Sequence, residues 1–256
     1  MRIVVVGASS GLGRCIGVAL GQRGENVALL ARRKERLDEA ATEAGASAVA
    51  IACDVSDETS CAAAIDEAAR ALGGVDALIY TPAIGPLAHI EDVTAQTWRQ
   101  VFDTNVIGAS LVTSAALPHL AKTHGVAVYL SSVSASHTPV WPGLGAYITT
   151  KAALEKLIEV WRAEHSEVAF TRIVVGDTAG GEGPGMTEFA NDWDPALAGE
   201  FAPQWLERGL STLGGMLVDV EEIVNVVHNV LTLGATASIP TVMVTPRPLA
   251  TPELTD

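Results

Sequence analysis

The stretch that decides the fold is RIVVVGASSGLG, residues 2–13. Its first half is an apolar run of strand length, and its second half is a glycine-rich turn. Apolar residues at Cys15, Ile16, Ala19 and Leu20 follow at helical spacing. A buried strand that runs through a glycine-rich turn into a helix is typical of a dinucleotide-binding unit.

Each glycine of this turn has its own expected role. Gly7 permits the tight turn, Gly11 lets the backbone approach a pyrophosphate at the helix N-terminus, and Gly13 lets the helix lie close to the sheet. The spacing is G-x-x-x-G-x-G, which differs from the common G-x-G-x-x-G. The cofactor-binding residues predicted here are Gly7, Ser9, Ser10, Gly11, Leu12 and Gly13.

Strand-length apolar runs alternate with helical stretches along the rest of the chain. The expected strands are residues 2–6, 26–31, 47–53, 75–80, 125–131, 168–175 and 239–244. The expected helices are residues 11–23, 34–44, 58–72, 94–121, 145–163, 196–210 and 219–232. The alternation predicts an α/β fold, with one Rossmann-like, doubly wound domain over residues 1–256 and a mainly parallel sheet of about seven strands. The irregular stretch 176–195 follows the sixth strand, where a substrate loop is expected.

Tyr147 and Lys151 lie four residues apart in one expected helix, so they share a helix face. An ammonium about 4 Å from a phenol, at an effective dielectric of about 20, favours the phenolate by roughly 4 kcal/mol, on the order of three pKa units. The pair therefore predicts a phenol that can act as an acid near neutral pH. A Tyr and a Lys at this spacing also occur in ordinary amphipathic helices, and it is the dinucleotide-binding unit that favours the catalytic interpretation.

Taken together, the glycine-rich turn and the Tyr-Lys pair resemble the short-chain dehydrogenase/reductase family, over nearly the whole chain. Cys53-Asp54-Val55 matches the place where the family sets an aspartate against the adenine ring. Asp103-Thr104-Asn105-Val106 matches the family's helix asparagine, and Ser131-Ser132 ends a strand upstream of the tyrosine, as the family's serine does.

The resemblance implies an NAD(P)(H)-dependent oxidoreductase that interconverts a carbonyl compound and a secondary alcohol by hydride transfer. Tyr147 is the expected general acid and base, and Lys151 is expected to lower the pKa of the phenol and to bind the nicotinamide ribose. Ser132 is expected to hold the carbonyl oxygen, and Asn105 to position a water that relays protons. The family also implies cofactor contacts by Asp54, Val55, Tyr147 and Lys151.

The identity of the serine stays open between two positions. Ser132 closes the strand, whereas Ser134 lies at a distance from Tyr147 closer to the family's usual spacing. We favour Ser132, because strand ends are fixed by the sheet and a loop can absorb extra residues.

Cofactor choice depends on the end of the second strand, where an enzyme that prefers NAD usually has an acidic residue. This chain has Ala31 there, followed by Arg32 and Arg33. A guanidinium can bind a phosphate bidentately, so we favour NADP(H) over NAD(H). The two arginines can also be solvated charges at the start of the next helix.

The chain departs from the family pattern after two strands. Tyr80-Thr81-Pro82-Ala83 stands where many members have Asn-Asn-Ala-Gly, and Val175-Gly176 stands where Pro-Gly is usual. From these segments we expect cofactor contacts by Thr81, Pro82, Ala83, Gly176 and Thr178. In the loop that follows, we expect Met186, Phe189 and Trp193 to cover a hydrophobic or mixed substrate.

Composition excludes several other classes of protein. With 256 residues, 48% of them hydrophobic, the chain suits one large core, and its net charge of −14 opposes general binding to nucleic acid or anionic membranes. Three cysteines are too few for a disulfide framework and lack the spacing of a metal site, so we expect packing thiols and no metal. The first strand begins at residue 2 and no apolar stretch reaches membrane-spanning length, from which we expect a cytoplasmic protein.

Two expectations concern partners and the alternative function. The helices with Leu111, Ala115, Leu157 and Trp161 can cover the sheet and still present small or apolar groups outward, and the family commonly pairs these helices, so we expect a homodimer or homotetramer. The alternative to an enzyme is a catalytically idle dinucleotide-binding protein that acts as a redox sensor or scaffold. The complete set of Asn, Ser, Tyr and Lys favours the enzyme.

Overall fold

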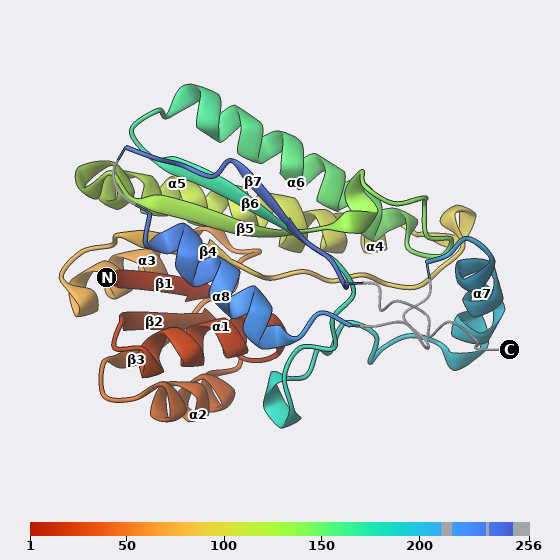
Figure 1. Cartoon of the computed structure of the whole chain (residues 1–256), viewed down its shortest axis with the longest axis horizontal. Coiled ribbons are helices and arrows are strands. Elements are labelled where there is room, and N and C mark those ends of the chain that lie inside the picture. The colour runs from red at the N-terminus through yellow and green to blue at the C-terminus, as the bar shows by residue number, and fades with distance from the viewer. Residues whose placement is uncertain (211–216, 234–235, 248–256) are drawn as a thin grey trace, which may run out of the picture.

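The computed structural model describes residues 1–210, 217–233 and 236–247 (Figure 1). Within these residues the seven strands form one sheet in the order β3-β2-β1-β4-β5-β6-β7, with every neighbouring pair parallel. The strands are β1 (Arg2–Val6), β2 (Asn26–Ala31), β3 (Ala48–Ala52), β4 (Ala77–Tyr80), β5 (Val126–Ser132), β6 (Ala169–Val175) and β7 (Thr241–Val244).

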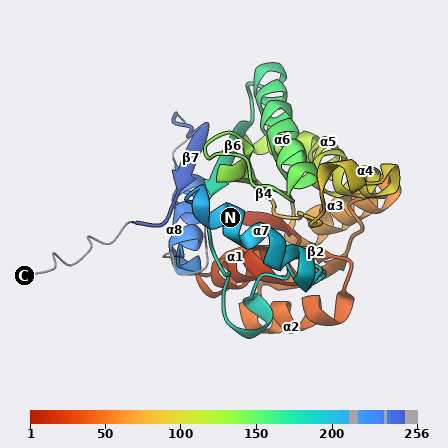
Figure 2. The same ribbon diagram turned by 90° about the vertical axis from the view of Figure 1, so that its right-hand side faces the viewer.

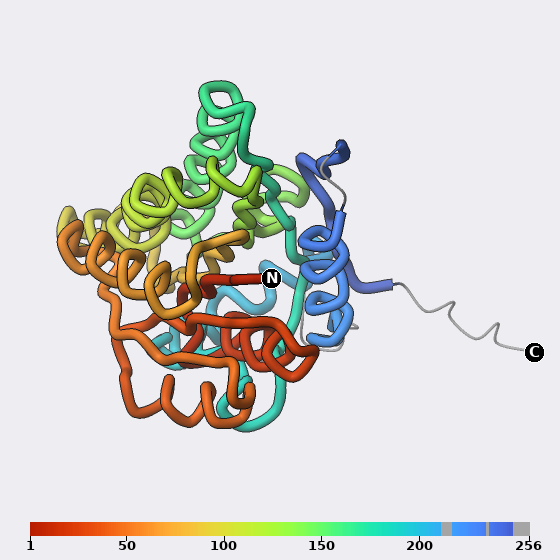
Figure 3. The backbone as a smooth tube through the Cα atoms, turned by 90° about the vertical axis from the view of Figure 1, so that its left-hand side faces the viewer, coloured from red at the N-terminus to blue at the C-terminus, as the bar shows by residue number. Residues whose placement is uncertain are grey.

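Helices connect the strands and cover both faces of the sheet. They are α1 (Gly11–Gln22), α2 (Lys34–Ala44), α3 (Glu58–Leu72), α4 (Ala95–Phe102), α5 (Gly108–Thr123), α6 (Gly145–Glu164), α7 (Pro195–Glu207) and α8 (Val220–Leu231). Helices α3, α5 and α6 lie on one side of the sheet and α1, α2 and α8 on the other, as Figure 3 shows from the amino end of β1.

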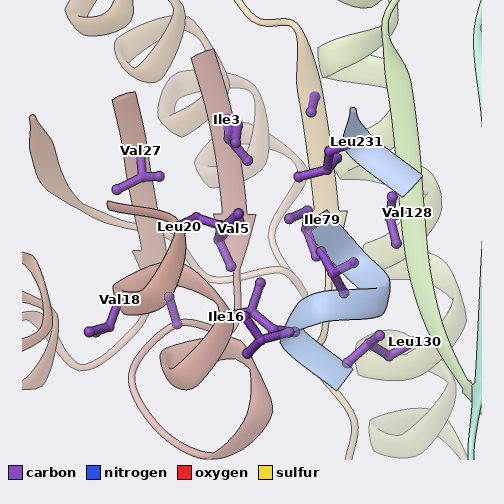
Figure 4. Close-up of a cluster of buried hydrophobic side chains, with 14 of the residues drawn as sticks. Ile3, Val5, Ile16, Val18, Leu20, Val27, Ile79, Val128, Leu130 and Leu231 are labelled. Atoms are coloured by element: carbon purple, nitrogen blue, oxygen red, sulfur yellow. The ribbon is translucent and has the colours of Figure 1, made fainter. Parts of the chain in front are cut away.

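The two layers arise because successive side chains of a strand point to opposite faces. Ile3 and Val5 of β1 point toward α1 and α8, where Ile16 and Leu231 pack against them (Figure 4). Val4 and Val6 belong to the second cluster, together with the apolar residues of α3, α5 and α6. Strands buried on both faces need nearly continuous apolar sequences, which is why the sequence of β1 could be interpreted so readily.

The order of the strands reverses direction between β1 and β4. In open parallel sheets, ligands bind outside the carboxyl ends of the strands at such a switch point. The glycine-rich turn after β1 and Thr81 after β4 meet at this point, where the Thr81 hydroxyl donates to the Val6 carbonyl at 2.7 Å. The sheet therefore places the turn predicted to bind a dinucleotide at the expected edge.

The elements agree with the sequence prediction except in one helix. The predicted helix 94–121 is divided by a π-helical turn at Asp103–Ile107, which separates α4 from α5. The turn contains Asn105, whose side chain is fully buried. A π-turn inside a helix frequently marks a functional position, and apolar periodicity alone does not reveal it.

The segment after β6 makes a local excursion before it reaches α7. Gly180 pairs with Met186 in an isolated antiparallel bridge, and the Thr187 N–H donates to the Ala179 carbonyl at 2.9 Å. Ala179 and Thr187 are therefore neighbours, and residues 180–186 form a loop between them, which we call the excursion. Helix α7 then lies across the carboxyl end of the sheet (Figure 2), where Phe201 and Trp205 form a third apolar cluster with Trp141.

Two further sequence predictions concern cysteines and membranes. Cys15, Cys53 and Cys61 are free thiols, and the last two are buried, as expected of packing residues. Among the helices in the part of the chain that the structure describes, none has the length and apolar character needed to cross a membrane.

Candidate active site

The glycine-rich turn, which we call the cradle, is packed so closely that side chains at Gly7 or Gly13 would collide with neighbouring atoms. Gly7 has a φ of +84° and Gly11 a φ of +56°, a region that favours glycine. A methyl group added at Gly13 would lie 2.4 Å from the Gly7 carbonyl oxygen and 2.3 Å from Thr81 Oγ1. The close approach of α1 to the turn therefore requires Gly13, as predicted.

The N-terminus of α1 is directed at this cradle. Ser10 is the N-cap residue, and within the described residues its side chain makes no capping hydrogen bond to α1. Its hydroxyl instead accepts a hydrogen bond from Arg33 Nη2 at 2.8 Å. The amide groups of the first turn of α1 can thus receive an anionic group, which is how dinucleotide pyrophosphates are commonly bound.

The two arginines that follow β2 lie near different parts of the structure. Arg33 turns back over the glycine-rich turn and donates to the Ser9 and Ser10 hydroxyls. Arg32 lies near Asp54 after β3. Hydrogen bonds from Ser56 are the main cause of the lowered pKa of Asp54, and the charge of Arg32 adds to it. Asp54 and Val55 follow β3, so they lie with Arg32 and Arg33 at the same end of the cleft.

Tyr147 and Lys151 are adjacent on the inner face of α6, as the sequence predicted. Lys151 Nζ lies 5.7 Å from the centre of the Tyr147 ring and donates to the Leu130 carbonyl of β5 at 2.7 Å. Burial lowers the pKa of Lys151 to about 8, while the charge of Glu155 acts in the opposite direction. An amine with this pKa is protonated at neutral pH and can release its proton just above it.

The expected lowering of the phenol's pKa is wrong for this structure. Burial raises the pKa of Tyr147 to about 12, and the Ser132 side chain opposes the rise. Phe189 contributes to this burial, because it packs edge-on against Tyr147 with 4.8 Å between the ring centres. The sequence argument counted the charge of Lys151 but not the desolvation of the phenol.

The structure also distinguishes the two candidate serines. Ser132 is the serine that influences Tyr147, and its Oγ lies 2.9 Å from Ser134 Oγ. Ser134 is buried behind it. On each side of this pair, Ser131 and Ser136 donate to the buried carboxylate of Glu155, which also pairs with Arg172 at 3.1 Å. Glu155 therefore holds the strand end that presents Ser132 to Tyr147.

Asn105 joins α6 to the segment after β4. Its Nδ2 donates to the Ile84 carbonyl and to Thr150 Oγ1, and its Oδ1 accepts from the Ile84 N–H, each at 2.9 Å. Both amide protons are thus engaged within the protein. The side chain positions the turn that follows Ala83, beside the helix that carries Tyr147.

The segment Thr81 to Ala83 supports the sheet despite its unusual sequence. The Thr81 backbone N–H and hydroxyl both donate to the Val6 carbonyl. Pro82 lies over the turn, since a methyl group added at Gly7 would come within 3.1 Å of its Cγ and Cδ. The hydroxyl of Thr81 therefore links β4 to β1 at the cleft.

Gly176 and Thr178 have local structural roles that the sequence did not predict. A methyl group at Gly176 would meet Pro246 at 2.9 Å, so the close approach there comes from the segment after β7. The Thr178 hydroxyl accepts from the Gly180 N–H at 3.1 Å and begins the excursion.

Three consecutive residues, Thr187, Glu188 and Phe189, which we call the strap, run from the glycine-rich turn to Tyr147. Thr187 lies over the glycine-rich turn, since a methyl group at Gly11 would lie 3.7 Å from its Cα. Glu188 pairs with Arg33, and Phe189 packs on Tyr147. Sequence reasoning missed Thr187 and Glu188, because the excursion 180–186 hides how close they come to β6.

Two of the three residues predicted to cover the substrate, Phe189 and Trp193, lie at the Tyr147 end. Phe189 packs against Trp193, and the Trp193 indole donates to the Gly85 carbonyl at 2.8 Å. Met186, in contrast, is 55% exposed and lies in the excursion. The bridge to Gly180 holds Met186 outside the cluster of Phe189 and Trp193.

The comparison with known families decides what this arrangement is. A model described as short chain dehydrogenase matches residues 1–188. The chain belongs to the short-chain dehydrogenase family. The match includes the glycine-rich turn, Asn105, Ser132, Tyr147 and Lys151.

Relatives within this family carry names of dehydrogenases and oxidoreductases. An 11-beta-hydroxysteroid dehydrogenase-like protein of Arabidopsis thaliana is 34% identical over 169 residues, which are 64% of this chain and 54% of the relative. An uncharacterized oxidoreductase of Methylorubrum extorquens is 35% identical over 158 residues, 60% of this chain and 62% of the relative. The matched part spans about half the length of the first Arabidopsis relatives.

Solved structures share the fold over nearly the full chain. A short-chain dehydrogenase from Streptomyces avermitilis has a TM-score of 0.77 at 27% identity, covering 94% of this chain and 86% of its own. An alcohol dehydrogenase from Thermococcus sibiricus, complexed with 5-hydroxy-NADP, has a TM-score of 0.78 at 23% identity, covering 97% and 98%. A 3-ketoacyl-(acyl-carrier-protein) reductase from Brucella melitensis, complexed with NADH, has a TM-score of 0.77 at 20% identity, covering 95% and 96%.

Proposed function

We propose that the protein is an oxidoreductase that uses NAD(P)(H) to interconvert a carbonyl compound and a secondary alcohol. The observation that carries the proposal is the group formed by Tyr147, Lys151 and Ser132, which the sheet sets at the same edge as the glycine-rich turn. Family membership supports the reaction class.

The residues of the turn fit a dinucleotide by their own geometry. Side chains at Gly7 or Gly13 would collide with Thr81 or with the Gly7 carbonyl, so the glycines keep the turn tight beside the N-terminus of α1, whose first amide groups can receive an anion. Arg33 and Arg36 already bind a carboxylate, that of Glu188, which stands in for an anionic group of a ligand. When bound, the dinucleotide supplies the hydride that is transferred to or from carbon.

The chain's own groups manage the substrate oxygen and its proton. In the reducing direction, Tyr147 donates the phenolic proton to the carbonyl oxygen as charge develops there. The Ser132 hydroxyl donates a hydrogen bond to the same oxygen, and Lys151 stabilises the phenolate that Tyr147 leaves. Phe189 must move from Tyr147 for a substrate to reach the phenol, because the two rings are in contact.

Two narrower proposals concern the ligands. NADP(H) is preferred over NAD(H), because Ala31 cannot accept a hydrogen bond from a ribose hydroxyl and Arg33 can bind a phosphate. The substrate carries an apolar body, because Phe189, Trp193 and Trp205 lie at the Tyr147 end of the cleft.

A third proposal is self-association through α5 and α6, to a homodimer or homotetramer. Outward-facing residues of α6 include Ala153, Leu157 and Val160, which share a helical stripe, and Val160 is 45% exposed. Leu111 and Ala115 of α5 are also only partly buried.

The reaction is tested with NADPH, a panel of aliphatic and aromatic ketones and diketones, and the variant Tyr147→Phe. The wild type should oxidise NADPH with at least one ketone, and the variant should be slower by about 10²–10⁴-fold, because it lacks the proton donor. NADPH binding, followed by fluorescence, should change little, since the phenol's hydroxyl is the only group removed. Equal NADPH binding by both proteins without turnover of any carbonyl compound would favour an idle dinucleotide-binding protein instead.

A further inference from the structure

Arg33, on which the proposed cofactor choice depends, already holds an anion that this chain supplies. Its Nη1 donates to Glu188 Oε2 at 2.8 Å, and Arg36 pairs with Oε1 of the same carboxylate. Nη2 of Arg33 donates at the same time to Ser10 Oγ at 2.8 Å and to Ser9 Oγ at 3.0 Å. Two guanidinium groups therefore hold the carboxylate beside the glycine-rich turn.

This position lies between the ends of β1 and β2. Ser9 and Ser10 follow β1, and Arg33 comes two residues after the end of β2. In a doubly wound sheet, the ribose of the adenosine half lies against the end of β2, where its 2′ substituent is recognised. The Glu188 carboxylate thus occupies the donors that a 2′-phosphate would use.

The carboxylate resembles that phosphate in the sign of its charge and in its capacity to accept hydrogen bonds. Although burial opposes its ionisation, hydrogen bonds from Arg36, Arg33 and Ser10 lower the pKa of Glu188 to about 2. Glu188 is therefore negatively charged at neutral pH and accepts from a guanidinium through each oxygen, as a phosphate does.

The contact is also one that a ligand can replace. The side chains of Arg33, Arg36 and Glu188 are 42%, 45% and 34% exposed, and ion pairs so exposed contribute little stability. A hollow of about 320 Å³ lies beside them, between α2 and the strap, and is lined by Arg36, Thr187, Glu188 and Asn191 among others. It gives the Glu188 side chain space to move into.

We propose that Glu188 competes with the 2′-phosphate of NADP(H) for Arg33 and Arg36, and so limits the preference of the enzyme for NADP(H) over NAD(H). This inference rests on the proposed function. A 2′-phosphate enters only when the carboxylate leaves, whereas an unphosphorylated ribose does not compete with the carboxylate for the two guanidinium groups. Loss of Glu188 therefore removes a competitor of one cofactor and not of the other.

The position of Glu188 in the strap extends the consequence to the Tyr147 end. Glu188 directly precedes Phe189, which covers Tyr147, and directly follows Thr187, which covers Gly11. Displacement of the carboxylate releases the centre of the strap from α2. Binding of a 2′-phosphate and uncovering of Tyr147 are thereby linked through three consecutive residues.

The test is the variant Glu188→Gln, which keeps the size of the side chain and removes its charge. Binding of NADPH, NADH, 2′,5′-ADP and 5′-ADP is measured by isothermal titration calorimetry at constant ionic strength. The matched control is Asp192→Asn, which removes the same charge at an exposed position of the same loop. Thermal unfolding of each protein confirms that the variants are folded.

We expect Glu188→Gln to bind NADPH and 2′,5′-ADP about tenfold more tightly than the wild type, because one unit of like charge a few ångströms from the phosphate is removed. NADH and 5′-ADP should change less than twofold, and Asp192→Asn should leave all four ligands unchanged. Equal changes for phosphorylated and unphosphorylated ligands, or weaker NADH binding alone, would overturn the inference but not the proposed function. A wild type that binds neither dinucleotide would overturn both.

Discussion

Lys151 brings a charged group into one of the most enclosed positions of the molecule. Its side chain is 3% exposed and hydrogen bonds to the Leu130 carbonyl, with the Glu155 carboxylate one helical turn further along α6. Burial disfavours the ammonium more than Glu155 stabilises it, so the pKa falls to about 8. A lysine buried in this way costs stability at neutral pH.

Because of this cost, the unfolding free energy of the wild type should depend on pH. The variant Lys151→Met should lack this dependence. Between pH 8 and pH 10, the unfolded chain still binds the proton of Lys151, with a pKa near 10.4, while the folded chain has released it, so stability rises with pH. The unfolding free energy of the wild type minus that of the variant should increase by about 2 kcal/mol across this range. Urea unfolding at pH 7, 8, 9 and 10 measures it. A difference that stays constant would mean that Lys151 titrates outside this window.

At the scale of single residues, the sequence was sufficient to predict pairs of residues close together in the chain. It was insufficient to predict which distant residues pack over them. The four-residue spacing placed Tyr147 beside Lys151, and the choice of Ser132 over Ser134 remains a prediction that rests on the strand end. Tyr147 contacts Phe189, 42 positions later in the numbering, and no local pattern indicates that contact. Glu188 was not predicted as a site residue for the same reason, because the arginines that it contacts lie far away in the sequence, at the start of α2.

At the scale of elements, periodicity and glycine placement located nearly every strand and helix. Buried parallel strands are apolar on both faces, and the helices between them carry one apolar stripe, so both patterns are visible in the sequence. The π-turn at Asp103–Ile107 was not visible, because it is fixed by the hydrogen bonds of Asn105 to Ile84 and Thr150. The excursion 180–186 was also hidden, since its bridge joins residues of no distinctive type.

The packing of α1 on the glycine-rich turn makes a sharp prediction for one glycine. Gly13→Ala should destabilise the protein by about 2–3 kcal/mol, because its methyl group would meet the Gly7 carbonyl oxygen, which backbone geometry fixes. Gly199→Ala in α7 is the matched control, since nothing lies within 4 Å of its added methyl group. The control should gain about 0.5–1 kcal/mol from helix propensity.

Chemical unfolding and NADPH titration of both variants test this prediction together. Gly13→Ala should also weaken NADPH binding, because α1 must shift its N-terminus away from the cradle. A Gly13→Ala protein as stable as the wild type would show that α1 can move without cost.

At the scale of the whole molecule, one side of the sheet is left with an unpaired helical surface. Helices α4, α5 and α6 lie together on this side (Figure 2), and the inner residues of α5 and α6 fill the core with Tyr80 and Tyr129. The outer stripe of α6 keeps Val160 45% exposed, although burying that side chain in an interface would be favourable. A second copy of the same helices offers an equivalent surface related by twofold symmetry.

If the protein associates through this surface, one charge placed at the centre of the surface should weaken the association. The wild type should sediment as a dimer or tetramer at micromolar concentration, and Val160→Asp should shift it toward the 26.5 kDa monomer, because a carboxylate on a twofold interface is desolvated opposite its own copy. Leu206→Asp is the control, since Leu206 is 55% exposed on α7, which lies across the carboxyl end of the sheet. If the control dissociates the protein and Val160→Asp does not, the interface lies over α7 and involves the cover of the cleft. A wild type that sediments only at 26.5 kDa would mean that the α6 stripe remains exposed to solvent.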